Sequence, residues 1–166
     1  MVMNTNPRHG TKAVPQTGVT TLVVNDSPFM LKTLSQILER AGKFDLVGTA
    51  TNGGQALRYV SMLSPELVLM DMHMPRLNGI QATRCIKQGE HPPVVILISS
   101  DDSSVTRSLV EEARADAFVS KHRNLRHRLI GALQDLFGPA CARRGAAGGI
   151  HLQMPPAGQQ NEDHGT

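Results

Sequence analysis

The sequence predicts an α/β domain built on a mostly parallel sheet. Five short apolar runs rich in Val, Ile and Leu alternate with five segments of helical length and period, and such alternation is typical of strand–helix–strand units. Three of the runs lack polar residues at alternate positions, which favours strands buried on both faces of a parallel sheet. The predicted strands are residues 20–24, 44–49, 66–70, 94–98 and 117–120.

The first predicted helix, residues 28–41, begins with clear local signals. Ser27 is in position to cap its amino end, and Pro28 suits the first helical position because that residue needs no N–H partner. The other four helical segments carry apolar residues three or four positions apart, which predicts one buried stripe on each helix. These segments are residues 53–63, 79–88, 103–115 and 124–137, and Gly138-Pro139 ends the last of them.

The two ends of the chain differ from its middle in composition. Residues 1–18 and 138–166 are rich in Gly, Pro, Gln, Asn and Ala and show no periodicity. We therefore predict a flexible tail on each side of one folded domain, residues 19–137. The residues after 137 are too few for a DNA-binding or catalytic domain, which predicts a stand-alone domain; a fragment of a longer protein is the alternative.

The composition predicts a cytoplasmic protein that has no contact with a membrane. Hydrophobic residues make up 40% of the chain and charged residues 19%, as in ordinary globular proteins. No apolar stretch approaches the roughly 20 residues of a membrane span, and the amino terminus lacks the apolar core of a signal peptide. The two cysteines, Cys85 and Cys141, show no metal-binding spacing and are predicted to be reduced thiols.

Polar side chains follow four of the five predicted strands. Asn25-Asp26 ends the first strand, Asp71 the third, Ser99 the fourth and Lys121 the fifth. Because ligands of open parallel sheets bind at the carboxyl ends of the strands, these side chains are expected to converge on one edge. Carboxylate and amide oxygens suit Mg²⁺ or Mn²⁺, whereas a lysine and a hydroxyl suit a phosphoryl group. Asp71 is thus a candidate nucleophile that forms an acyl phosphate.

With these residues in place, the chain from about residue 19 to residue 137 resembles the response regulator receiver domain, the phosphoacceptor of two-component signalling. Asp71 lies in the frame D-x-x-M-P-x-x-x-G. The matching positions are Asn25-Asp26 at the acidic pair of the family, Asp71 at the phosphoacceptor, Ser99 at the switch hydroxyl, Phe118 at the switch aromatic and Lys121 at the phosphate-binding lysine.

The resemblance implies a flavodoxin-like fold with strand order 2-1-3-4-5 and helices on both faces of the sheet. It also implies Mg²⁺-dependent transfer of a phosphoryl group to Asp71 from a histidine kinase or a histidine phosphotransfer protein. Asp26 and Asp71 would ligate the metal directly, His73 through its backbone carbonyl and Asn25 through water. Such a protein is no conventional enzyme, because it phosphorylates itself and slowly removes its own phosphoryl group.

Three positions depart from the family pattern. Asn25 replaces an acid, which predicts weaker metal binding. His122 follows the lysine where many family members have a proline in cis; since a non-proline cis bond costs about 3 kcal/mol, we expect a trans bond there. Ser100 stands where a smaller alanine is common and is expected to crowd the phosphoryl site slightly.

Partners are predicted from the resemblance and from charge. The resemblance implies that a downstream protein binds the fourth helix, the fifth strand and the fifth helix in a phosphorylation-dependent way. Residues 101–116 are mainly acidic and residues 121–144 mainly basic, which favours a surface for a partner or for a homodimer. Solvated helix faces explain the same charges equally well. No direct binding to nucleic acid is expected.

Two other functions remain as alternatives. A phosphatase of the haloacid type would need a second aspartate two residues after the nucleophile, where this chain has His73. A pseudo-receiver would keep the fold as a protein-binding module without phosphorylation, and Asn25 is its best support. Two side chains also have plainer explanations, since the His73 imidazole is expected to point to solvent and Phe118 suits the core as well as a switch.

Overall fold

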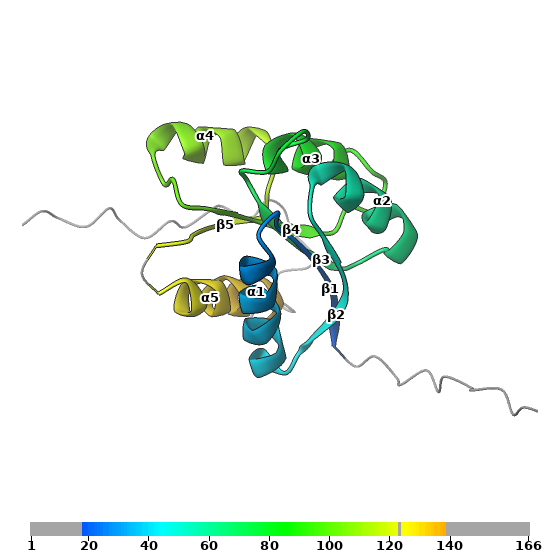
Figure 1. Ribbon diagram of the computed structural model, residues 1–166, viewed down its shortest axis with the longest axis vertical. Coiled ribbons are helices and arrows are strands. Elements are labelled where there is room, and N and C mark those ends of the chain that lie inside the picture. Colours follow the sequence, from blue (N-terminus) through cyan, green and yellow to red (C-terminus); the bar gives the residue numbers. More distant parts are fainter. Residues whose placement is uncertain (1–17, 123, 139–166) are drawn as a thin grey trace, which may run out of the picture.

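The computed structural model describes residues 18–122 and 124–138, and there the five strands form one parallel sheet in the order β2-β1-β3-β4-β5 (Figure 1). This is the predicted order. The strands are β1 (Val19–Val24), β2 (Phe44–Ala50), β3 (Leu67–Asp71), β4 (Val94–Ser99) and β5 (Ala117–Ser120). The helices are α1 (Pro28–Ala41), α2 (Gly53–Leu63), α3 (Gly79–Ile86), α4 (Ser104–Glu112) and α5 (Leu125–Phe137).

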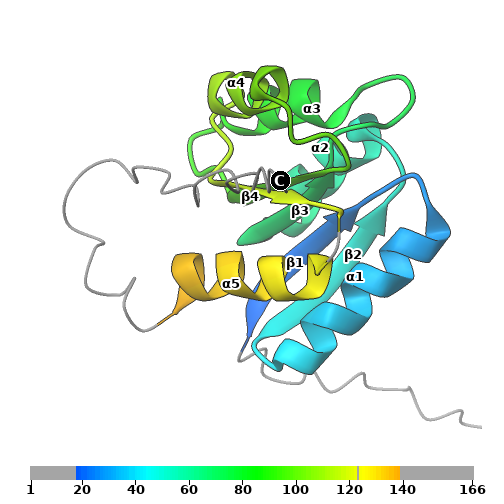
Figure 2. The same ribbon diagram turned by 90° about the vertical axis from the view of Figure 1, so that its left-hand side faces the viewer.

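Helices cover both faces of the sheet. Figure 2 shows α2, α3 and α4 on one face and α1 with α5 on the other. Two hydrophobic cores result, and successive residues of a strand enter them in turn: Leu22 and Val24 pack under α2, α3 and α4, whereas Val23 packs under α1 and α5. Every residue of β3 is buried. The unbroken apolar runs of the sequence therefore reflect strands that are covered twice.

Helix starts agree with the local signals. Both α1 and α2 have the predicted bounds, and the Ser27 Oγ accepts a hydrogen bond from the Met30 N–H at 3.4 Å. The predicted start of α4 was one residue too early because Ser103 is its cap, whose hydroxyl accepts from the Thr106 N–H. The backbone of Gly42 ends α1 at a φ of 67°, a conformation that glycine adopts without steric cost.

Apart from Gly18 and Gly138, the predicted tails, residues 1–18 and 138–166, lie outside the described part of the chain, and Cys141 lies there too. In the part that is described, every helix is too short or too polar to cross a membrane.

Candidate functional site

The strand register brings the predicted site residues to one edge of the sheet. Val24 lies opposite Met70, so Asn25 follows β1 next to the end of β3. Asp71 lies opposite Ile98, and Ser99 lies opposite Ser120 in the last pair of strands. The carboxyl ends of β1, β3, β4 and β5 therefore meet, as the sequence predicts.

Asp71 is a buried carboxylate held by a lysine. Its residue is 2% exposed, and its Oδ2 accepts a hydrogen bond from the Lys121 Nζ at 2.7 Å. Its Oδ1 accepts a longer bond, 3.3 Å, from the His73 N–H. A buried charge is costly unless it is paired and hydrogen-bonded. The ion pair with Lys121, 50 residues away in sequence, therefore offsets the burial of the carboxylate.

The chain folds tightly against Asp71 where α3 begins. The Gly79 N–H donates to the carbonyl of Met72 at 3.0 Å, and Met72 itself donates to Ile98 of the neighbouring strand. A Cβ atom at Gly79 would lie 2.0 Å from the carbonyl oxygen of Asp71. The glycine of the D-x-x-M-P-x-x-x-G frame thus permits a backbone contact that any side chain would prevent.

The two residues after β1 have different surroundings. Asp26 is exposed at the rim of the strand edge. Asn25 is fully buried, and its Oδ1 accepts a hydrogen bond from the Ser27 N–H at 2.9 Å. The Nδ2 of Asn25 is buried and has no hydrogen-bond partner.

The carboxylates at the carboxyl ends of β1 and β3 are possible ligands of a metal ion. Within residues 18–122 and 124–138, no three side chains of His, Cys, Asp or Glu are grouped to hold a metal. Mg²⁺, however, is commonly held by one or two carboxylates together with substrate oxygens and waters. Asp26 lies just beyond the end of β1 and Asp71 ends the adjacent strand β3, and both supply the hard oxygen atoms that this ion prefers. The chemistry of these residues therefore fits Mg²⁺.

The Ser99 hydroxyl has two neighbours. Ser99 is fully buried, and its Oγ accepts a hydrogen bond from the Asp101 N–H at 3.0 Å. The same Oγ lies 3.4 Å from the His73 Nδ1. The expectation that the His73 imidazole simply points to solvent was therefore wrong in part, because the residue is exposed but one ring nitrogen faces Ser99. Nothing in the sequence indicates this contact.

The fifth strand ends as expected. The Lys121 N–H donates to the carbonyl of Ser99 at 2.7 Å, which places the lysine beside Asp71. No peptide bond between described residues is cis, so the predicted trans bond before His122 is confirmed. Phe118 is half-buried and packs against the core under α2, α3 and α4. Ser100, the third departure from the family, is exposed.

Several acids of the segment 101–116 form hydrogen bonds or ion pairs with other residues of the domain. The Asp101 carboxylate accepts from the Ser103 N–H and the Thr106 hydroxyl; these bonds, the first more than the second, lower the pKa of Asp101. Glu112 pairs with Arg84 at 2.7 Å, and Asp116 pairs with Lys87. The acidic segment therefore offers less free charge to a partner than the sequence suggests.

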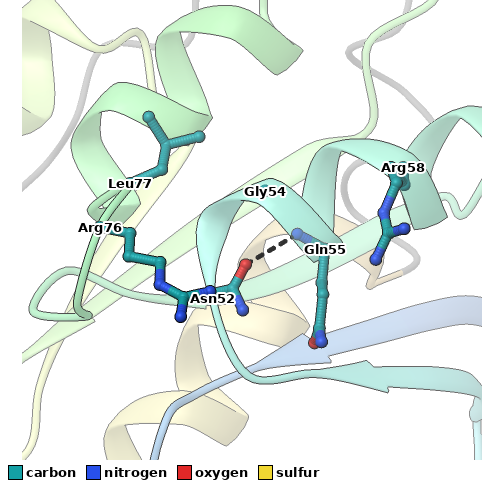
Figure 3. A pocket seen from close by; sticks show the side chains of 6 residues that line it. All are labelled: Asn52, Gly54, Gln55, Arg58, Arg76 and Leu77. Carbon is teal, nitrogen blue, oxygen red and sulfur yellow. Dashed lines mark hydrogen bonds between the residues drawn. The ribbon is translucent and has the colours of Figure 1, made fainter.

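A cavity of about 380 Å³ lies elsewhere, between the start of α2 and the loop that follows β3 (Figure 3). Its lining consists of Asn52, Gly54, Gln55, Arg58, Arg76 and Leu77. The Oδ1 of Asn52 accepts from the Gln55 N–H at 2.9 Å and so caps α2. None of the predicted site residues lines this cavity. We therefore place the candidate site at the carboxyl ends of β1, β3, β4 and β5, which we call the strand edge.

Comparisons with known proteins identify the family of this chain. The family model described as the response regulator receiver domain matches residues 21–134. A protein-glutamate methylesterase/protein-glutamine glutaminase of Halobacterium salinarum is 33% identical over 140 residues, which is 82% of this chain and 40% of that protein. The chain thus spans well under half the length of that relative.

Solved structures show the same domain. The response regulator domain of Thermotoga maritima CheB is 27% identical with a TM-score of 0.65, over 71% of this chain and 95% of that one. A chain of the CheX-CheY-BeF3-Mg²⁺ complex from Borrelia burgdorferi is 26% identical with a TM-score of 0.64, over 71% of this chain and 88% of that one. On the family match, the strand order and these neighbours, the chain belongs to the response regulator receiver domain family.

Proposed function

We propose that this chain is a phosphoacceptor that receives a phosphoryl group on Asp71 from a histidine kinase or a histidine phosphotransfer protein. One observation carries the proposal: a carboxylate that is 2% exposed ends a central strand with the Lys121 Nζ 2.7 Å away. An apolar residue at this position would stabilise the core more than a buried charge does. A carboxylate there therefore indicates a chemical role. Family membership supplies the class of reaction.

The residues of the site divide the chemistry among them. An oxygen of Asp71 attacks phosphorus, the N–P bond of the phosphohistidine breaks, and the imidazole leaves with the bonding electron pair. Lys121 then pairs with the transferred phosphoryl group, and the Ser99 hydroxyl can donate to it. Asp26, Asp71 and the His73 carbonyl would hold Mg²⁺, or Mn²⁺ in its place, with Asn25 acting through water. When bound, the ion neutralises charge on the phosphoryl oxygens.

The direct test is labelling with acetyl phosphate in the presence and absence of Mg²⁺. The phosphoacceptor is expected to carry a stable label that depends on Mg²⁺. Continuous release of phosphate with no labelled protein would instead indicate a phosphatase. If the protein is neither labelled nor hydrolyses acetyl phosphate, the pseudo-receiver is favoured. The buried Asn25 supports this second candidate because it takes the place of an acid.

Phosphorylation is expected to change the surface formed by α4, β5 and α5. The Ser99 Oγ now accepts from the Asp101 N–H, and this bond must weaken if the hydroxyl turns to a phosphoryl oxygen. The half-buried Phe118 would then turn inward, and a target protein or a second copy would bind the altered face. Backbone amide shifts on adding beryllofluoride are expected to cluster between Ser99 and Leu129. Shifts confined to the strand edge would exclude this switch.

Replacing Asn25 with aspartate is expected to tighten Mg²⁺ binding. The restored charge acts on the ion through water, and changes in such outer groups typically alter metal affinity about 10- to 100-fold. The Oδ1 of Asn25 accepts one bond, from Ser27, and keeps a second lone pair for a metal-bound water. Titration of Mg²⁺ into both proteins, followed by NMR, measures the difference. Equal affinities would place Asn25 outside the reach of the metal.

A further inference from the structure

The amide of Asn25 is oriented by its neighbours. Its Oδ1 accepts a hydrogen bond from the Ser27 N–H at 2.9 Å, and its backbone N–H donates to the carbonyl of Ala50 at 3.0 Å. A rotated amide would set its NH₂ group against the Ser27 N–H, donor against donor. The atom left without a role is therefore the Nδ2, which can donate and cannot accept.

This donor is buried without a partner. Asn25 has no exposed surface, and its Nδ2 forms no hydrogen bond. Among the described residues, one other side-chain atom shares this condition, the Thr83 Oγ1 on α3. Buried amide groups nearly always have a partner because leaving one unsatisfied is costly. An exception at the candidate site indicates that the partner arrives with a ligand.

The register places this donor beside Asp71. Val24 lies opposite Met70, so Asn25, the residue after Val24, comes next to Asp71, the residue after Met70. Val24 and Met70 both belong to the core under α2, α3 and α4, so the alternation of side chains along a strand predicts that Asn25 and Asp71 project toward the opposite face. Asp71 meets Lys121 there, at the end of β5. Asn25 thus follows the strand on one side of β3, and Lys121, which pairs with Asp71, follows β5 on the other side.

We infer that the Nδ2–H of Asn25 donates a hydrogen bond to an oxygen of the phosphoryl group on Asp71. The inference rests on the proposed function. It assigns Asn25 a role opposite in kind to that of a carboxylate, which accepts hydrogen bonds and repels an anion. Asn25 then favours the phosphoryl group directly, at the same position where an acid would favour the metal.

The test measures the affinity for the phosphoryl mimic separately from the affinity for Mg²⁺, in the full-length chain. Beryllofluoride serves as the phosphoryl mimic, and its affinity is measured by NMR at saturating Mg²⁺. The variant Asn25→Asp keeps an oxygen that accepts from the Ser27 N–H but loses the Nδ2 donor. It is expected to bind beryllofluoride about 10- to 100-fold more weakly, which corresponds to the loss of one charge-assisted hydrogen bond. The same variant is expected to bind Mg²⁺ more tightly. Asn52→Asp, which adds the same charge at the cap of α2, is expected to leave both affinities unchanged.

The Asn25 side chain also reports directly. In the native chain, its two Nδ2 proton signals are expected to separate and move downfield when beryllofluoride is added. This measurement needs no variant, so it still tests the inference if Asn25→Asp folds poorly. Unmoved signals, or an affinity for beryllofluoride in Asn25→Asp equal to or tighter than in the native chain, would overturn the inference. Such results with Asp71 still labelled by acetyl phosphate would leave the proposed function intact. Absence of both beryllofluoride binding and labelling would instead remove the proposed function, and the inference with it.

Discussion

The variant Asp71→Asn is expected to lose all labelling by acetyl phosphate. An amide nitrogen has no free electron pair with which to attack phosphorus, and the amide oxygen is a far weaker nucleophile than a carboxylate oxygen. The loss should be complete because Asp71 combines burial, a lysine partner at 2.7 Å and a position at the carboxyl end of a central strand. Phosphate-specific gel retardation or mass spectrometry of the intact protein measures the label.

Asp116 provides a matched control for this experiment. It too pairs with a lysine, Lys87, and its Oδ2 accepts from the Val95 N–H at 2.7 Å. Asp116 precedes β5, however, so it lies at the amino ends of the strands, away from the candidate site. Asp116→Asn is therefore expected to keep full labelling. A label that persists in Asp71→Asn, or that disappears in Asp116→Asn from a folded protein, would contradict the assignment of the phosphoacceptor.

The variant Gly79→Ala is expected to destabilise the domain and to slow labelling together. The added Cβ would lie 2.0 Å from the carbonyl oxygen of Asp71 and 2.9 Å from the Met72 Cα. Both are backbone atoms, so no side chain can rotate away to make room. Overpacking of this kind costs about 1–3 kcal/mol in the free energy of unfolding, and sometimes more. The backbone that must move carries Asp71, so the loss of stability and the slower labelling are expected together. Urea unfolding measures the first effect and the rate of labelling the second.

Gly131 offers the same substitution where there is space. It lies within α5, and a Cβ atom there would meet no heavy atom within 4 Å. Gly131→Ala is expected to stabilise the domain by about 0.5–1 kcal/mol because alanine loses less backbone entropy in a helix. Labelling should not change. Equal stability of the Gly79→Ala variant and the native chain would mean that the start of α3 can shift away from Asp71 at no cost.

The sequence alone predicted the order of the elements and the place of the candidate site at the carboxyl ends of the strands. Ser27 and Pro28 mark the start of α1 by local hydrogen bonding and a fixed φ, and these effects need no neighbour outside the helix. The unbroken apolar runs predicted strands covered on both faces, and the five strands are found in the predicted order. Parallel strands place their carboxyl ends together, so the meeting of Asp71 and Lys121 follows from topology.

The tertiary structure decided how the side chains of that edge are used. The contact of His73 with Ser99 joins residues 26 positions apart. The orientation of the Asn25 amide depends on the path of the chain through Ser27. Asp101, which the sequence places in an acidic segment, is exposed and accepts hydrogen bonds from Ser103 and Thr106 at the start of α4. Periodicity reports which face of an element is buried; it carries no information on side-chain rotamers or on which donor meets which acceptor, because packing against distant segments selects them.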